Sequence, residues 1–274
     1  MTESYPAVPR RQRDVLTANR TYYVRTDGSD SNTGLVDSAG GAFLTIQKAI
    51  DTAAGLDILI YDVTIQIGAG TYTTSVGLVA KQCVGAGAVI LLGDETTPSN
   101  VVSTTNGAMT VSDGLFLNRN VQTTYRLKGI TFSSTASGTV FGIAGSTNSY
   151  TEFQNIVIST GINQHIRADD GAIVKATGPY TIAAGGALHL TATAAIIRMQ
   201  SITVTLTGTP AFSSGFAIPS RLGMILATAV TFSGSATGKR YTVTENAVAV
   251  TNGGGANYFP GDVAGTTGTG GQYN

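Results

Sequence analysis

The sequence predicts an all-β chain that folds as a right-handed parallel β-helix, a solenoid of three-strand turns capped at its N-terminal end by one short helix. Three observations lead to this prediction. The composition favours strands and tight turns, an apolar pattern repeats about every 24 residues, and only one stretch has the periodicity of an amphipathic helix.

The composition is rich in glycine and poor in charge. Of the 274 residues 35 are glycine and only 12% are charged, whereas average usage is about 7% glycine and about 25% charged. Threonine, serine, valine and isoleucine fill much of the rest, and β-branched residues favour strands. The formal net charge is zero and no basic stripe follows the chain, so we expect no binding of nucleic acid by the main domain.

A five-residue pattern recurs along the chain: small or polar, apolar, mostly threonine, apolar, small or polar. The first apolar residues of its five clear copies are 26, 24, 22 and 28 positions apart; they are Ile130, Ile156, Tyr180, Ile202 and Val230. Weaker copies begin at Val63, Val89 and Met109, and two further apolar pairs precede each clear copy. We therefore expect three strands per turn, with the five named residues stacked in one interior column about 4.8 Å apart.

The one helical pattern covers residues 44–54. Its apolar residues recur at three- and four-residue spacing and form a single stripe: Phe43, Ile46, Ala49, Ile50 and Ala53. Thr45 is expected to cap the start of the helix and Gly55 to end it. An open end of a β-stack recruits other strands, and we expect this helix to cover the first turn.

The chain divides into three parts. Residues 1–20 lack apolar periodicity and are expected to form an arm that attaches to another protein, residues 21–240 to form the capped β-helix, and the glycine-rich residues 241–274 to form a tail that packs between subunits. Residues 1–20 lack the apolar core of a signal peptide, and no stretch reaches the length of a membrane span. We expect synthesis in a cytoplasm without export by that route, no membrane insertion, and no cofactor.

Two segments carry a family resemblance. The residues YYVRTDGSDSNTG at 22–34, followed by GAFLTIQKAID at 41–51, resemble the first strand and loop of the pectin-lyase-like β-helix superfamily. Residues 232–241 and 253–261 resemble C-terminal parts of tail fibre or tail spike proteins of bacteriophages. The resemblance implies a virion protein, a homotrimer, that binds polysaccharide on the host surface and is mounted on other tail or baseplate proteins, which we expect residues 1–20 to contact.

Alternative functions remain on the same fold. One is a polysaccharide depolymerase, either a lyase or a hydrolase, and another is a fibre or decoration protein of the capsid surface. The hydrolases need two carboxylates facing one sugar. Residues 100–240 contain only four: Asp113, Glu152, Asp169 and Asp170. The scarcity of carboxylates favours a non-enzymatic virion protein that adheres to the host surface.

A few polar residues are candidates for a site. Asp169 and Asp170 precede Gly171, a sequence typical of a turn, and a catalytic or Ca²⁺-binding role is the alternative. The residues His165, Arg167 and His189 fall on neighbouring turns. If their side chains face outward, they could bind an anionic sugar or take part in proton transfer. The alternative is that they are scattered surface residues without a shared function.

The loop after the first strand offers a candidate metal site. Asp27, Asp30 and Asn32 supply the oxygen ligands that Ca²⁺ prefers, although these residue types also stabilise loops without any metal.

Overall fold

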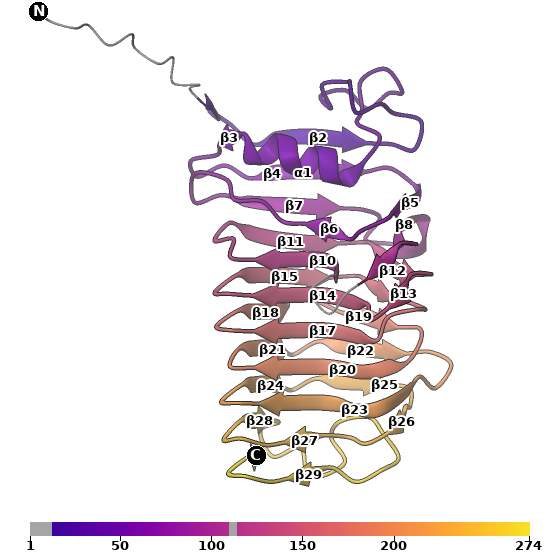
Figure 1. Ribbon diagram of the computed structural model, residues 1–274, viewed down its shortest axis with the longest axis vertical. Helices are drawn as coiled ribbons and strands as arrows, with labels where there is room; N and C mark the ends of the chain where they lie inside the picture. The colour runs from indigo at the N-terminus through magenta and orange to yellow at the C-terminus, as the bar shows by residue number, and fades with distance from the viewer. Residues whose placement is uncertain (1–12, 110–113) are drawn as a thin grey trace, which may run out of the picture.

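The computed structural model describes residues 13–109 and 114–274, and it is a parallel β-solenoid of about eight turns. Its axis runs from β2 at one end to β29 and the C-terminus at the other (Figure 1). All strand pairs of the described residues are parallel, and one α-helix and one 3₁₀ turn, η1 (Pro98–Asn100), accompany them. The predicted fold class is therefore confirmed.

Three sheets form the sides of the solenoid, and most turns give one strand to each. Sheet 1 has ten strands: β2 (Arg20–Val24), β4 (Val63–Ile67), β7 (Ala88–Leu92), β11 (Thr124–Lys128), β15 (Tyr150–Gln154), β18 (Ile173–Ala176), β21 (Ile196–Gln200), β24 (Met224–Thr228), β28 (Val248–Val250) and β30 (Gln272–Tyr273). Sheet 2 has seven: β5 (Gly70–Thr74), β8 (Val101–Thr105), β12 (Thr131–Ser134), β16 (Val157–Ile158), β19 (Tyr180–Ile182), β22 (Thr203–Leu206) and β25 (Thr231–Ser233).

Sheet 3 also has seven strands: β6 (Leu78–Val79), β10 (Gly114–Arg119), β14 (Phe141–Ser146), β17 (Gln164–Asp169), β20 (Gly186–Thr193), β23 (Ala211–Ser220) and β26 (Thr237–Gly238). Three short pairs complete the solenoid: β1 (Asp14–Val15) with β3 (Leu56–Asp57), β9 (Ala108–Met109) with β13 (Ser137–Gly138), and β27 (Thr242–Val243) with β29 (Thr266–Thr267). The last pair continues the side of sheet 3 next to β23. The residues of each strand largely alternate between the buried interior and the surface, as a strand requires.

The predicted interior column holds for three of its five members and then shifts. Thr131 pairs with Val157 and Val157 with Thr181, which stacks Ile130, Ile156 and Tyr180. Tyr180 itself then pairs with Val204 instead of Ile202, and the column continues through Val204 to Phe232. Ile202 and Val230 are still buried, because a shift of two residues leaves a side chain on the same face of the strand.

The small first residue of the repeated pattern has a conformational role. It occupies the corner between sheets 1 and 2, where Gly129, Asn155, Ser201 and Ala229 have φ values of 64°, 49°, 52° and 53°. Positive φ is favoured by glycine and tolerated by asparagine. Pro179 holds the same position in the remaining copy, and its ring fixes φ near −65°. The turn there follows a different path, and the shift of the column occurs at the next step.

The weaker copies of the pattern belong to other columns. Val63 begins β4 and Val89 is the second residue of β7, both in sheet 1, and Met109 lies in the corner strand β9. These copies therefore do not continue the series of the clear copies in sheet 2. Strands on all three sides of the solenoid alternate apolar and polar residues in the same way, so the pattern alone does not tell which side a strand occupies.

The helix α1 (Ile46–Ala54) lies across the N-terminal end beside β2 and β4 (Figure 1). The Thr45 side chain caps it by accepting a hydrogen bond from the Lys48 N–H at 3.2 Å, as predicted. Its apolar stripe is buried against the first turns. Gly55 ends the helix in a right-handed conformation, with φ of −74°, so its freedom to adopt positive φ is not used.

The glycine-rich tail continues the solenoid. Ile225 pairs with Ala249 and Ala249 with Tyr273, so that two more strands extend sheet 1. The ring of Tyr241 stacks on that of Tyr273 with 3.9 Å between centroids, and Phe259 is fully buried. These aromatic side chains contact the last turns of their own chain, and the packing of residues 241–274 between subunits stays a prediction.

The interior column predicts a large difference between adjacent positions of β22. Val204→Asp places an unpaired carboxylate in the buried stack, and the free energy of unfolding should fall by about 3–5 kcal/mol. Thr203→Asp puts the same charge on the exposed neighbour, where the change should stay within about 0.5 kcal/mol. Chemical denaturation of both variants tests this. Equal stabilities would contradict the inward orientation of Val204.

Candidate functional site

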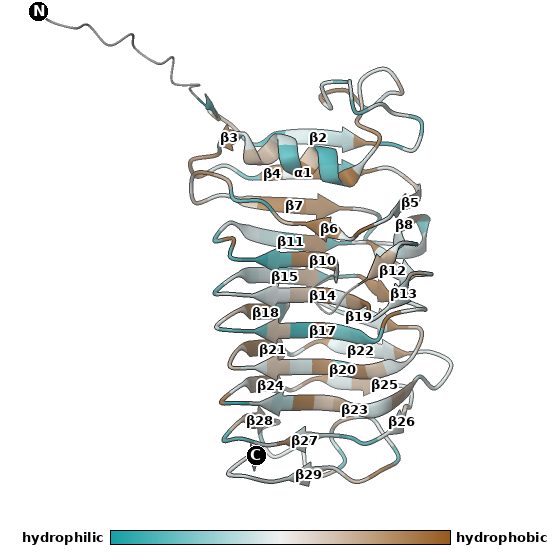
Figure 2. Ribbon diagram, in the orientation of Figure 1, coloured by the Kyte–Doolittle hydropathy of each residue, from teal (hydrophilic) through white to brown (hydrophobic). Residues whose placement is uncertain are grey.

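His165 on β17 and His189 on β20 lie inside the solenoid and are fully buried, although an outward orientation was predicted. Figure 2 shows β17 as a largely hydrophilic strand. Its hydrophilic residues nevertheless do not all face outward, since His165 is buried. The reason for the error is local. His165 and Ile166 are adjacent and both buried, so the alternation of inward and outward residues fails at this end of the strand.

The two histidines belong to a buried chain of hydrogen bonds. Their Nδ1 atoms are 3.1 Å apart, His189 Nε2 is 2.8 Å from the Tyr180 hydroxyl, and that hydroxyl donates to the sulfur of Met199 at 3.4 Å. These distances fit neutral rings with His165 Nδ1 and His189 Nε2 as donors. Burial lowers the pKa of His165 to about 4 and the pKa of His189 well below its ordinary value. The chain is structural, with no access for a sugar.

Arg167 and Asp169 do face outward on sheet 3. The Arg167 side chain donates to the Asp169 carboxylate, and its guanidinium carbon lies 4.4 Å from the centre of the Phe141 ring. Burial raises the pKa of Asp169, and it outweighs the opposing charge of Arg167. Asp170 is exposed at φ of 51° before Gly171 at 79°, so the predicted turn is present. Asp169 and Asp170 do not converge on one site; Asp113 lies outside the described residues.

The loop candidates for Ca²⁺ are engaged in the loop itself. The Asp30 carboxylate accepts from the Thr45 N–H at 2.9 Å and the Thr45 hydroxyl at 2.8 Å, which fixes the start of α1. Asp27 pairs with Arg25 at 2.8 Å, and Asn32 donates to two backbone carbonyls. In the ranges that the structure describes, no group of three or more His, Cys, Asp or Glu side chains is placed to hold a metal ion.

A column of charges that was not predicted from the sequence lies on the outer face of sheet 1. Arg126, Glu152, Lys175 and Arg198 are successive register partners on β11, β15, β18 and β21, and we call them the charged column. Each stands between two inward residues, as in the Tyr125–Leu127 segment. The signal was therefore present in the sequence: a charged residue at the central outward position of four consecutive strands of sheet 1.

Glu152 is the centre of this column. Its carboxylate accepts from Arg126 Nε at 2.9 Å and from the Tyr150 hydroxyl at 2.8 Å, and Lys175 Nζ lies 3.5 Å away. Arg126 also reaches Asp62 at 3.3 Å. Burial alone would raise the pKa of Glu152, but these hydrogen bonds and cations lower it below its ordinary value. Glu152 is therefore an ionised clamp for two cations.

Arg198 is the last residue of the charged column, and it differs from the other three residues in its lack of an ion pair among the described residues. Its side chain is exposed. Together with Lys175 it lines a hollow of about 250 Å³ on the surface, whose other lining residues are uncharged: Ala176, Thr177, Gln200 and Ser201. Two cations about 4.8 Å apart along the stack, flanked by hydroxyl and amide groups, can bind a carboxylate or sulfate together with neighbouring hydroxyls.

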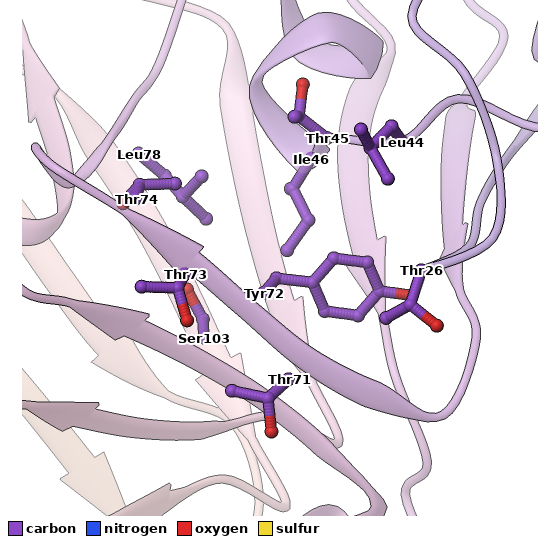
Figure 3. A pocket seen from close by; sticks show the side chains of 10 residues that line it. All are labelled: Thr26, Leu44, Thr45, Ile46, Thr71, Tyr72, Thr73, Thr74, Leu78 and Ser103. Atoms are coloured by element: carbon purple, nitrogen blue, oxygen red, sulfur yellow. The ribbon is translucent and has the colours of Figure 1, made fainter.

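A second hollow, also of about 250 Å³, lies at the N-terminal end (Figure 3). Ile46 at the start of α1 points toward the Tyr72 ring, with Thr26 and Leu44 on one side of that ring and Leu78 and Ser103 toward the other (Figure 3). Its lining is apolar and hydroxyl-bearing without any charged residue; Thr45, Thr71, Thr73 and Thr74 complete it. This pocket does not share a residue with the charged column.

Comparison with known proteins places the chain in no family: no family model, curated protein or solved structure matches it significantly. In the part of the chain that the structure describes, no helix has the length and apolar character needed to cross a membrane. The charged column is therefore interpreted from its own geometry.

The buried histidines predict a loss of stability in mild acid. The unfolded chain takes up protons on both histidines near pH 6.5, whereas the folded chain resists protonation because their pKa values are lowered. The contribution of the two buried, neutral histidines to the free energy of unfolding is fully present above pH 6.5. As the pH drops toward 5, this free energy should fall by up to about 1.4 kcal/mol per pH unit for each histidine. Denaturation at pH 7.5, 6 and 5 measures this slope.

The His165→Leu/His189→Leu double variant is the control, because it removes both titrating groups and leaves the Tyr180 hydroxyl its contact with Met199. Its stability should depend much less on pH in the same interval. The same slope in both proteins would show that other groups cause the acid sensitivity.

Proposed function

We propose that this chain is an adhesive, non-enzymatic virion component, a bacteriophage tail fibre or tail spike, whose sheet 1 face binds acidic polysaccharide on a host surface. The observation that supports this most directly is the hollow beside Lys175 and Arg198, with its unpaired guanidinium. The resemblance of residues 22–34, 232–241 and 253–261 to β-helix and tail proteins supports the assignment to a virion.

The chemistry of the hollow favours an anionic, hydroxyl-rich ligand. The planar guanidinium of Arg198 suits a carboxylate or sulfate, to which it can donate two parallel hydrogen bonds. Gln200 and Thr177 lie beside it and can bond to sugar hydroxyls. Among the described residues, the ion pairs of the three cations of the column involve two carboxylates, those of Glu152 and Asp62, so one positive charge is left for the ligand.

We further propose a homotrimer with parallel solenoid axes, mounted on other tail or baseplate proteins through residues 1–20, of which Asp14–Val15 and Leu16 pack against the first turns of the solenoid. The support is the composition: with only 12% charged residues, the solenoid carries few of the charges that usually keep β-surfaces apart. The alternative to a position on the tail is a position on the capsid surface. Electron microscopy of intact particles in which this protein is labelled distinguishes the two positions.

A depolymerase on this fold is less well supported. A glycoside hydrolase needs a protonated acid beside an ionised carboxylate. Asp62 and Glu152 both contact Arg126, and the lowered pKa of Glu152 makes it a poor proton donor. Asp169 has a raised pKa but is paired with Arg167.

Incubation with acidic polysaccharide should therefore leave the polymer's size unchanged on a sizing column. A progressive fall in size would establish the enzyme instead.

Loss of the two cations should weaken binding of acidic glycans selectively. For Lys175→Gln/Arg198→Gln we expect the affinity for uronic-acid oligosaccharides to fall about three- to thirtyfold, the range of two partly exposed ion pairs. Raised salt should weaken the wild-type interaction as well. Calorimetry with acidic and neutral oligosaccharides of equal length measures both effects.

Arg221→Gln is the matched control, because Arg221 is exposed and pairs with Glu245 away from the charged column. It removes one positive charge from the surface and should leave the affinity unchanged. Equal losses in both variants would mean that only the overall charge matters, and unchanged binding in the double variant would place the glycan elsewhere.

A further inference from the structure

The pocket beneath α1 borders an edge strand whose backbone is only half paired. β5 is the last strand of sheet 2 at this end and pairs with β8 alone. The Asn106 N–H donates to the Thr74 carbonyl at 3.1 Å, which shows that Thr74 bonds toward β8. Because successive residues of a parallel strand bond to opposite sides, the N–H and C=O groups of Thr71 and Thr73 face away from β8.

No covering strand satisfies these groups. Among the described residues, no backbone hydrogen bond joins Thr71 or Thr73 to the segment above them. Both side chains are exposed, and the pocket beside them has no charged lining residue. Edge strands usually carry charges, prolines or a cover that prevents further pairing, and β5 has none of these over Thr71–Thr74.

The pocket also reaches the apolar core at this corner. Ile46, Tyr72 and Leu78 belong to the buried core, yet they form the floor of the pocket. Leu44, at the rim, is 42% exposed. The helix α1 therefore covers the end of the solenoid incompletely, and the uncovered corner combines an apolar floor with a row of free backbone donors and acceptors.

We propose that β5 accepts an extended strand from a partner protein, which adds to sheet 2 and places one uncharged apolar side chain over Ile46, Tyr72 and Leu78. Free donors and acceptors at strand spacing match a peptide backbone. The volume of about 250 Å³ is below the range of about 300–1,000 Å³ typical of pockets for whole small molecules, and it suits a single side chain. The uncharged lining excludes a charged residue at that position.

The test uses acetylated and amidated heptapeptides in which serine and threonine alternate with a central valine, isoleucine or leucine. Their binding to the full chain is measured by NMR through the amide signals of Thr71 and Thr73. Thr73→Pro removes the outward N–H at a position where an edge strand tolerates proline, and the affinity should fall at least about threefold, the value of one hydrogen bond. Thr73→Val keeps the backbone donor and should bind as the wild type does.

Three outcomes would overturn the proposal: no binding of any of the three peptides at millimolar concentration, equal binding by Thr73→Pro, or signal changes at Thr71 and Thr73 caused by neutral oligosaccharides instead of peptides. The Lys175→Gln/Arg198→Gln variant should bind the peptides normally. Its behaviour separates this site from the charged column, so either proposal can fail without the other.

Discussion

Each turn of this solenoid hydrogen-bonds only to the turn before it and the turn after it, and this parallel register fixes the place of nearly every side chain. A residue on one strand stands directly over its partner one turn below, so that inward residues form continuous columns such as Ile130, Ile156 and Tyr180. Outward residues must form columns in the same way. Most additional residues are accommodated in the corners, and one extra residue lies in a bulge where β20 pairs with β23, so the repeat length varies while most of the register is kept.

The architecture was predictable because its signals are local and repeated. Alternating apolar residues showed the strands, and a Thr45 cap with a 3.6-residue stripe showed α1. The assignment of a strand to one of three sides was less predictable, as Val63 and Val89 show, since all sides share the same alternation. The pairing of Tyr180 with Val204 instead of Ile202 is a property of the register, which a count of residues does not reveal.

The candidate site was predictable in principle but needed the register. His165 and His189 drew attention as rare residue types, yet both are interior and neutral. The charged column consists of ordinary residues that become a site only when their strands are stacked. Glu152 restrains Arg126 and Lys175, and we propose that Arg198 at the end of the column binds the ligand. A repeating surface of this kind suits a polymer whose charges also repeat.

We propose that an acidic glycan lies against sheet 1 with its charge at Lys175 and Arg198. A crystal structure of the chain with a uronic-acid oligosaccharide tests it most directly. We expect a sugar carboxylate within hydrogen-bond distance of the Arg198 guanidinium, with Gln200 or Thr177 bonded to a neighbouring hydroxyl. An oligosaccharide bound on sheet 3 beside Arg167 and Asp169, or at any position away from the charged column, would show that Lys175 and Arg198 do not form the glycan site.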